Sequence, residues 1–505
     1  MSALSRLFLG AYSGLWRAAQ PLLRRHKRLR DDFARRLVPD NWLTAGQPGS
    51  DAAVPGTPGS DAAVPDIPGP DAPPLRIWIQ AASGGEAWLV HSLVPALVET
   101  LAGHPVLAGR RVHLLCTTWT RQGLDILEKL PPSPAVSFLS RLFPLDRPDV
   151  MRRAVAMARP DVVILLETEL WPGLLVAARE NGVPVLALNA RMTEKSFRAY
   201  GRLAFFWREH APERVLAISA EDADRFARLF GHSERVDVMP NIKFDRLLED
   251  STRPMRGDTP ASFRRAAGIG DDTLLAVLAS VREEEEDLLL PVVRALHGLF
   301  IHGHPVAVAV APRHMHRVEA WKAGLHAAGV PFRLRSMKDG QENGEDASTP
   351  SAVPPVYLWD TFGELPSLYA IADAAYVGGS LAPLGGQNFL EAAAQGVIPL
   401  VGPHIDNFLW AGKELFAEGL AVMLSGASEL GPALEQRLQA RLDALRHASK
   451  GCPPASNGPN EPDWQAARAN EAAQVRQRFA AWLRPRLGGS LQAAEALVRV
   501  LARRK

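Results

Sequence analysis

The fold is indicated most directly by the stretch Asp161-Val162-Val163-Ile164-Leu165-Leu166 and by the polar segment that follows it, Glu167-Thr168-Glu169-Leu170-Trp171-Pro172. An unbroken apolar run of this length predicts a strand that is buried on both faces of a sheet. The residues from Leu174 to Asn181 then predict a helix, and Pro184 to Leu188 predict another strand. Strand, helix and strand in this order predict two parallel strands joined by a crossover helix.

The same alternation extends in both directions along the chain. Upstream, we expect strands at Ile77–Ile79 and Val112–Cys116, with a helix from Leu89 to Leu101 between them. Downstream, Val215–Ile218 and Val236–Val238 continue the pattern. These segments together predict a parallel sheet with helices on both faces.

A second series of strands begins near Thr273. Ligands bind such sheets at the carboxyl ends of the strands, so two of these domains in series predict a ligand cleft between them. The fold class is therefore α/β with two doubly wound domains, although fold alone does not assign a function. The predicted strands of the second domain are Leu274–Ala279, Val306–Ala311, Phe332–Leu334, Val356–Leu358 and Ala374–Val377.

Changes in composition divide the chain into five segments. Residues 1–44 predict a helical segment, and residues 45–74 predict a disordered linker that contains the imperfect copies Pro48–Pro55 and Pro58–Pro65. Proline and glycine at this density cannot build a packed core. The remaining segments are a Rossmann-like domain at 75–248, a second at 249–480, and a helix at 481–505 that we expect to pack back on the first domain.

The composition is that of an ordinary globular protein. Of 505 residues, 47% are hydrophobic and 22% are charged, and the net charge of +2 gives no reason to expect a nucleic-acid partner. The two cysteines, Cys116 and Cys452, lie far apart and lack metal-ligand spacing. We therefore expect no disulfide framework and a reducing compartment.

The first helix has two interpretations. The stretch Leu4 to Leu23 is interrupted by Arg6, Arg17 and Gln20, so it predicts neither a membrane span nor a signal peptide. Its apolar face precedes a basic cluster, which suits the surface of an anionic membrane. The alternative is packing on the protein's own surface, and the aromatic residues favour the membrane. The apolar face comprises Leu7, Phe8, Tyr12, Leu15, Trp16, Leu22 and Leu23.

Glu86 is the first candidate for chemistry. It ends the segment Ala82-Ser83-Gly84-Gly85-Glu86, between the first predicted strand and a helix. A carboxylate there can act as a general base toward an acceptor hydroxyl. It can also simply complement the helix dipole, and spacing alone favours this second interpretation.

Further polar groups follow the other strands of the first domain. Glu167 and Glu169 occupy an active-site position of this architecture, and their alternative role is to cap the next helix. Closely spaced carboxylates in a cleft have displaced pKa values, which favours function. Arg191 and Lys243 follow later strands and can hold phosphates or a carboxylate, or can lie on a solvated face.

The second domain carries three more groups. Arg313 follows a strand and can pair with two oxygens of a phosphate or carboxylate at once. The segment Asp360 to Leu365 follows another strand and is a further candidate for the site. Alternatively, it is an ordinary helix cap. The loop Gly378 to Glu391 runs from a strand into a helix, where backbone N–H groups favour anions. Its glycine spacing matches neither a P-loop nor the dinucleotide fingerprint.

In order and content, these segments resemble the Kdo transferases of lipopolysaccharide synthesis, from about Leu75 to about Asn407. The resemblance implies an inverting glycosyltransferase of the GT-B fold that needs no metal and no cofactor. It implies Glu86 as the general base, a first domain for a lipid A precursor and a second for CMP-Kdo, at the cytoplasmic face of the inner membrane. The substrate-binding residues that it implies are Glu169, Arg191, Lys243, Arg313, Gly363, Ser380, Asn388 and Glu391.

The sequence departs from this family's pattern at four places. Gly84 stands where we expect valine, Gln387 where we expect histidine and Leu384 where we expect arginine, while Ala279 to Glu283 replaces Gly-Ser-Thr-His. These changes would alter contacts to the donor phosphate. They leave two alternatives open: another nucleotide-sugar transferase or epimerase of GT-B fold, and a non-catalytic lipid A-binding homologue.

Overall fold

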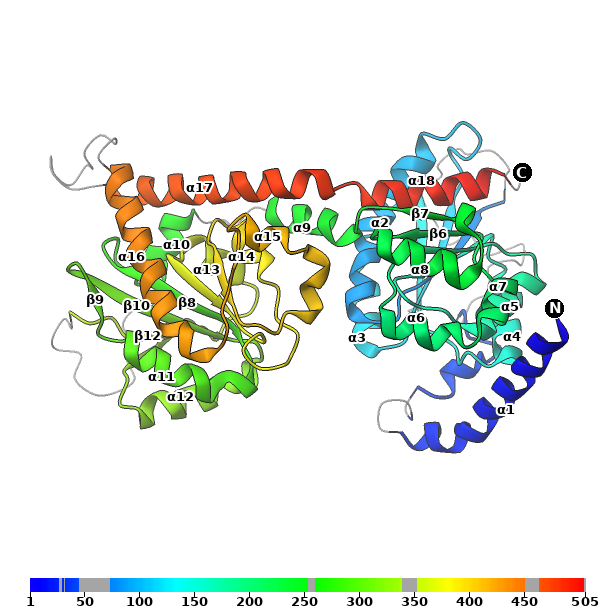
Figure 1. Ribbon diagram of the computed structural model, residues 1–505, viewed down its shortest axis with the longest axis horizontal. Helices are drawn as coiled ribbons and strands as arrows, with labels where there is room; N and C mark the ends of the chain where they lie inside the picture. Colours follow the sequence, from blue (N-terminus) through cyan, green and yellow to red (C-terminus); the bar gives the residue numbers. More distant parts are fainter. Residues whose placement is uncertain are drawn as a thin grey trace. The chain divides into compact units, whose positions relative to one another are not determined.

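The computed structural model describes residues 1–26, 30, 32–44, 73–252, 259–337, 352–449 and 463–503. The chain forms two compact units (Figure 1). Unit 1 comprises Met1–Arg246 and Arg486–Lys505, and unit 2 comprises Leu247–Pro485. Apart from its last two residues, the predicted linker at 45–74 lies outside the described residues.

Unit 1 is built on a seven-stranded parallel sheet with the strand order β3-β2-β1-β4-β5-β6-β7. The order reverses between β1 and β4, which is where sheets of this class bind ligands. The strands are β1 (Leu75–Gln80), β2 (Val112–Thr118), β3 (Val136–Leu142), β4 (Val162–Leu166), β5 (Val185–Ala190), β6 (Arg214–Ala217) and β7 (Val236–Val238). The helices are α1 (Ala3–Arg25), α2 (Gly84–Ala102), α3 (Arg121–Leu127), α4 (Pro148–Ala158), α5 (Pro172–Glu180), α6 (Glu194–Gly201), α7 (Ala204–Glu209), α8 (Ala220–Phe230) and α18 (Gly489–Ala502), with α9 (Ile242–Thr252) leading into unit 2.

Unit 2 repeats this architecture with the order β11-β12-β10-β8-β13-β14-β15, and a short β9 pairs antiparallel with β10. The strands are β8 (Leu274–Val281), β9 (Phe300–Ile301), β10 (His304–Pro312), β11 (Phe332–Leu334), β12 (Val356–Leu358), β13 (Ala374–Val377), β14 (Pro399–Val401) and β15 (Val422–Met423). The helices are α10 (Pro260–Ala266), α11 (Glu286–Leu296), α12 (Val318–Ala327), α13 (Leu365–Ile371), α14 (Leu390–Ala394), α15 (Glu414–Ala417), α16 (Leu430–Ser449) and α17 (Trp464–Leu483). The predicted fold class, two doubly wound α/β domains, is confirmed.

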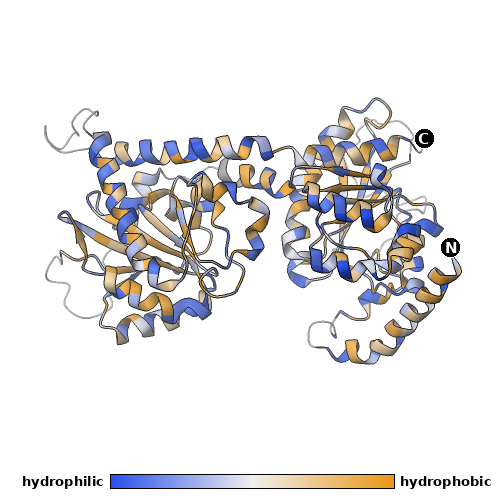
Figure 2. Ribbon diagram, viewed as in Figure 1, coloured by the Kyte–Doolittle hydropathy of each residue, from blue (hydrophilic) through white to orange (hydrophobic). Residues whose placement is uncertain are grey.

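The residues of β4 explain why this sheet is covered on both faces. Every residue of the strand is buried. Ile164 and Leu166 pack in one cluster with residues of α2 and α18, whereas Val163 and Leu165 pack in another with residues of α4 and α5. Successive side chains of a strand point to opposite faces, so a continuous apolar run needs a helical layer on each side. The strands are accordingly the most uniformly hydrophobic elements in Figure 2.

Helix α1 packs one face on unit 1 and leaves the other exposed. Tyr12 donates a hydrogen bond to Asp146 over 2.9 Å, and Leu9 is buried. Leu7, Leu15 and Leu22, by contrast, are about 70% exposed. The predicted apolar face is therefore split, with part of it packed on the protein's own surface. No helix among the described residues has the length and apolar character needed to cross a membrane.

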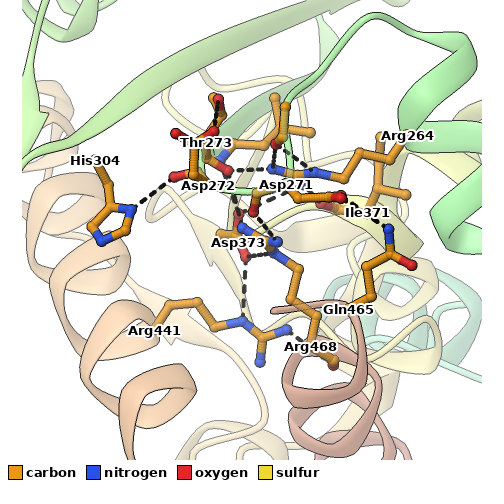
Figure 3. A network of polar contacts seen from close by, with 12 residues as sticks. Arg264, Asp271, Asp272, Thr273, His304, Ile371, Asp373, Arg441, Gln465 and Arg468 are labelled. Atoms are coloured by element: carbon orange, nitrogen blue, oxygen red, sulfur yellow. Dashed lines mark hydrogen bonds and ion pairs between the residues drawn. The ribbon is translucent and has the colours of Figure 1, made fainter. Parts of the chain in front are cut away.

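A buried ionic network joins the helices of unit 2 at the amino ends of its strands (Figure 3). Asp373 directly precedes β13, and its side chain is fully buried. It accepts a hydrogen bond from the backbone N–H of Leu275 over 2.9 Å. Arginines of three helices converge on its carboxylate, at N···O distances of 3.8 Å for Arg264 of α10, 3.5 Å for Arg441 of α16 and 3.1 Å for Arg468 of α17.

Candidate functional site

Glu86 lies in the first turn of α2, at the carboxyl edge of the unit 1 sheet. The hydroxyl oxygen of Ser83 accepts from the Glu86 backbone N–H over 3.3 Å and caps the helix. The Glu86 carboxylate in turn accepts from the Ala82 N–H over 2.6 Å and from the Ser83 hydroxyl over 3.0 Å. This is a variant of the capping box, so Glu86 does have a structural role at the helix start. The helix begins earlier than predicted because Ser83 caps it.

The environment of Glu86 is unusual for a capping residue. The residue is only 8% exposed. Burial raises the pKa of its carboxyl to about 8, with further contributions from the charges of Glu169 and Glu167. Burial, together with the charge of Glu167, also raises the pKa of Glu169 to about 7. Carboxylates whose pKa values are displaced by burial and by one another are typical of functional sites.

Lys243 joins this cluster through Glu167. Its ammonium nitrogen lies 2.5 Å from Glu167 Oε1. Helix α9, which carries Lys243, is held by Asn189, whose side-chain oxygen accepts from the Ile242 N–H over 2.9 Å. Glu167 and Asn189, at the ends of β4 and β5, both have positive φ angles, 57° and 53°. Non-glycine residues in this strained conformation concentrate at functional sites.

The helix after β4 is capped by a distant residue. The carboxylate of Asp146 accepts from the backbone N–H groups of Gly173 and Leu174, each over 2.8 Å. Burial raises the pKa of Asp146 to about 7. The interpretation of Glu167 and Glu169 as caps of this helix is therefore wrong, and both carboxylates are left for the edge of the sheet. Arg191 follows β5 at the same edge with a half-buried side chain.

In unit 2, the predicted residues meet in pairs at the carboxyl edge. Arg313 follows β10, and its Nε donates to Gln387 Oε1 over 3.0 Å. The side-chain amide of Asn388 donates to Glu391 over 2.7 Å. Gly363, in the turn after β12, has a φ of 84° and open space around it, so this turn requires the conformational freedom of glycine.

Ser380 holds the glycine-rich loop rather than facing solvent. It is fully buried. Its hydroxyl donates to the carbonyl of Val377 and accepts from the N–H of Gly402, each over 2.8 Å. The hydroxyl therefore ties the loop to the end of β14, and its predicted contact with substrate remains a prediction.

Glu285 is the residue of this region that sequence reasoning missed. Its fully buried carboxylate accepts from the backbone N–H groups of Gly379 over 2.5 Å and Leu381 over 2.8 Å, and from the Tyr376 hydroxyl over 2.9 Å. These loop N–H groups, which we expected to be available to an anion, are thus occupied by a carboxylate of the protein itself. The run Glu283 to Glu286 was visible in the sequence, but nothing in it identified which glutamate turns inward.

Glu285→Gln is expected to lower kcat/KM for the sugar donor that the family resemblance implies, by about 10- to 100-fold. An amide places N–H groups where a carboxylate accepted from the loop, and each charged hydrogen bond contributes about 1.5–3 kcal/mol. If Glu285 positions the donor loop, KM for the donor should rise while KM for the acceptor stays unchanged. The matched control is Glu286→Gln, because Glu286 is the next residue and pairs with Arg317 instead. Equal kinetics of the two variants would contradict this role.

Two of the sequence departures have local explanations. A side chain at Gly84 would place its Cβ 3.1 Å from Gln122 and 3.3 Å from Ile126, so α3 packs closely enough to favour glycine there. Gln387 accepts a hydrogen bond from Arg313, so the residue at this position fixes the guanidinium that we predict to contact the donor.

The fold defines a class of protein. The chain is similar to a solved glycosyltransferase of Rickettsia africae, with a TM-score of 0.50 and 10% identity over 85% of this chain and 100% of that one. The chain thus has the GT-B glycosyltransferase fold.

Sequence comparison identifies the family within this class. Residues 55–246 match the family described as 3-deoxy-D-manno-octulosonic-acid transferase. The chain is 32% identical to the 3-deoxy-D-manno-octulosonic acid transferase of Bordetella pertussis, covering 81% of this chain and 87% of that one. It is 28% identical to the Haemophilus influenzae protein of the same name, covering 74% and 80%. The chain belongs to the 3-deoxy-D-manno-octulosonic acid (Kdo) transferase family, as its resemblance predicted, and it is a glycosyltransferase.

Proposed function

We propose that this protein transfers Kdo from CMP-Kdo to a lipid A precursor, with Glu86 as the general base. Relatives that are 32% and 28% identical to this chain are named as Kdo transferases. The observation that carries the assignment of the base is the buried carboxylate of Glu86 beside Glu167 and Glu169, with its pKa raised to about 8. When the pKa of a general base lies near the working pH, a useful fraction of the base is ionised, and the ionised form is basic enough to accept the proton.

In the proposed reaction, the acceptor hydroxyl attacks the anomeric carbon of Kdo from the face opposite the phosphate. The bond to CMP breaks as the new glycosidic bond forms, and the sugar passes through an oxocarbenium-like state. Glu86 takes the proton of the attacking hydroxyl. Lys243 neutralises Glu167, which limits the negative charge around Glu86 and lets it ionise.

The donor would lie at the carboxyl edge of the unit 2 sheet. Arg313, held by Gln387, would offset the charge that builds up on the leaving phosphate, and Asn388 and Glu391 would contact the nucleotide or sugar. Because cationic side chains can supply this neutralisation, we expect the reaction to need neither metal nor cofactor. Activity that is unchanged by a chelator would support this expectation.

The outward face of α1 fits an anionic membrane surface. Leu7, Leu15 and Leu22 are exposed, and so are the arginines at positions 6, 17, 24 and 25. Apolar and basic side chains on one exposed helix bind lipid surfaces together. We propose that this face holds the protein at the cytoplasmic surface of the inner membrane, where the lipid acceptor is reached.

The double variant Leu7→Glu/Leu15→Glu is expected to reduce binding to vesicles containing phosphatidylglycerol at least tenfold. Both side chains point away from unit 1, so the fold should be unaffected. Leu288→Glu, at a leucine of unit 2 that is 42% exposed, is the control and should bind like wild type. Equal vesicle binding by all three proteins in a sedimentation assay would contradict the proposal.

The rate of transfer should rise with pH through the pKa of Glu86. Glu86 must be ionised to accept a proton, so kcat/KM should fall on the acid side with an apparent pKa of about 8. Glu169→Gln removes a neighbouring negative charge, which should shift the acid limb of the pH profile, the fall in kcat/KM at low pH, to lower pH. Coupled carboxylates titrate as a group, so the limb is compared between variants rather than assigned to one residue. A limb at the same pH in Glu169→Gln would disprove this coupling.

The function is tested by release of CMP from CMP-Kdo, with and without a lipid A precursor. Release that depends on the acceptor, together with a lipid product heavier by one or more Kdo units, would support the proposal. Other nucleotide sugars, tested in parallel, separate it from a different transferase or epimerase of the same fold. A folded protein that binds the lipid but releases no CMP would instead indicate a non-catalytic homologue.

A further inference from the structure

Unit 1 contains a cavity at the edge of its sheet opposite Glu86. Its volume is about 410 Å³, which is within the range of small-ligand sites. It lies at the amino ends of β5 and β6, because Val185 begins β5 and Glu213 precedes β6. Glu86 and Glu169 occupy the carboxyl edge, so this cavity is separate from the candidate active site.

The cavity is positively charged. Arg179, Arg235 and Arg503 line it, and Glu213 is its single acidic lining residue. Arg179 lies in the last turn of α5 and Arg503 directly follows α18, and helix carboxyl ends attract cations. This attraction accounts for two of the arginines, whereas Arg235 ends only a three-residue 3-10 helix, Ser233–Arg235.

The three guanidinium groups retain donors for a ligand. Each carries five N–H bonds. Arg179 donates through one nitrogen to the backbone carbonyl of Glu209. Arg235 has an acidic neighbour in Glu234, but its nitrogen is 3.9 Å from that carboxylate, which is too far for a hydrogen bond. A group with several anionic oxygens would satisfy donors from all three arginines together.

His210 is a titratable group beside the cavity. It lines the cavity and is only 4% exposed, yet neither of its ring nitrogens has a hydrogen-bond partner among the residues that the structure describes. Buried polar groups are nearly always paired. Burial lowers the pKa of His210, so a neutral ring presents one N–H donor and one acceptor. Both ring nitrogens are shielded from solvent, so a ligand in the cavity would lie beside this ring and alter its surroundings rather than accept its N–H.

We propose that this cavity binds a phosphate group, as a monoester or a diester, through Arg179, Arg235 and Arg503. Arginine forks match the paired oxygens of phosphate. The proposal does not depend on the transferase reaction.

The position of α1 suggests where the phosphate comes from. Glu209, adjacent to His210, accepts from the Ser2 N–H over 2.7 Å and lies 3.2 Å from the amino-terminal nitrogen. The cavity is therefore next to the start of the helix with the exposed leucines. A phospholipid headgroup and a free phosphate ester share the chemistry that this site recognises, and the test separates them.

The test uses the full-length protein and three probes: inorganic phosphate, glycerol 3-phosphate, and phosphatidylcholine vesicles with or without phosphatidylglycerol. Calorimetry measures the first two, and sedimentation measures the vesicles. Arg235→Gln/Arg503→Gln is expected to weaken binding at least tenfold. Arg228→Gln is the control, because Arg228 is another exposed arginine of unit 1 that pairs with Asp224 away from the cavity. Its binding should match that of wild type.

A direct readout comes from the ring nitrogens of His210 in isotope-labelled protein. Phosphate or glycerol phosphate should shift their NMR signals in a saturable way in wild type, and much less in the double variant. Saturable binding of the soluble probes identifies a free phosphate ester. A response to phosphatidylglycerol vesicles alone identifies a lipid headgroup. The proposal is overturned if no probe moves these signals. It is also overturned if the double variant Arg235→Gln/Arg503→Gln and the control Arg228→Gln bind the probes equally.

Discussion

Glu86→Gln is expected to lower kcat for Kdo transfer by about 10²- to 10⁴-fold, the usual contribution of a general base. Glutamine has nearly the same shape and can still accept from the Ala82 N–H, so the start of α2 should be preserved. What it loses is the ability to take a proton. The measurement is the initial rate of CMP release from CMP-Kdo with a lipid A precursor at pH 8.

The stability of this variant provides its control. The folded protein keeps Glu86 protonated up to a pH of about 8, whereas in the unfolded chain this group ionises near about pH 4.3. Ionised Glu86 therefore disfavours the folded state as the pH rises through that window, and the substitution by glutamine removes the effect. The variant should melt no lower than wild type at pH 9 and should still bind CMP-Kdo. Unchanged CMP release would exclude Glu86 as the base and make Glu169 the next candidate.

Asp373→Ala is expected to destabilise unit 2 by about 3–5 kcal/mol, the usual cost of removing one partner from a buried ion pair. The variant leaves Arg264, whose side chain is 3% exposed, without its counter-charge, and it removes the acceptor for the Leu275 N–H. It also removes the carboxylate at which Arg441 of α16 and Arg468 of α17 meet (Figure 3), which leaves Arg441 with its contacts to Glu471 and to the Arg468 carbonyl. Hydrogen exchange should show faster opening of β8 and β13, with β4 and β5 of unit 1 unaffected.

Glu319→Ala is the matched control within unit 2. Glu319 pairs with Lys322, but it is 79% exposed, and such surface pairs contribute at most about 1 kcal/mol. The effect of Asp373 should also depend on pH. Burial acts to raise the pKa of Asp373, but the three arginines together outweigh it and hold the pKa below its usual value, so the contribution of Asp373 is fully present above about pH 4 and is lost as the pH falls through the folded pKa. Equal stability of the two variants at pH 7 would contradict this role.

The apolar strands could be predicted from sequence because their pattern is local. β4, β8 and β10 are continuous apolar runs that only a sheet covered on both faces can bury, and each lies where it was expected. β3, β14 and β15 were missed: β15 has only two residues, and in β3 the polar residues Ser137, Ser140 and Arg141 interrupt the apolar pattern, although the three-residue strands β7, β11 and β12 were found. The C-terminal helix was predicted to begin at residue 481, but α17 ends at Leu483 and, after Pro485 and Gly488, α18 begins at Gly489.

The candidate site was predictable only in part, because sequence reveals local patterns but not contacts between distant residues. Glu86, Glu169 and Lys243 follow strands that were recognised, and parallel strands bring their carboxyl ends to one edge. Glu285 and Asp146 were missed because their partners are far away in sequence: Gly379 for one and Gly173 for the other. Capping and loop-holding contacts of this kind depend on the folded chain, and residue type alone does not reveal them.

The return of the chain to unit 1 through α18 affects the order in which the protein is made. Leu497, Val498 and Leu501 of α18 belong to the same core as Leu93 and Leu97 of α2. Unit 2, about 240 residues, is translated between these two helices. At ribosomal speeds this takes roughly 12 to 48 s. During that interval the apolar face of α2 that receives α18 is uncovered, so a nascent chain of this protein presents a binding surface to chaperones that the finished protein does not.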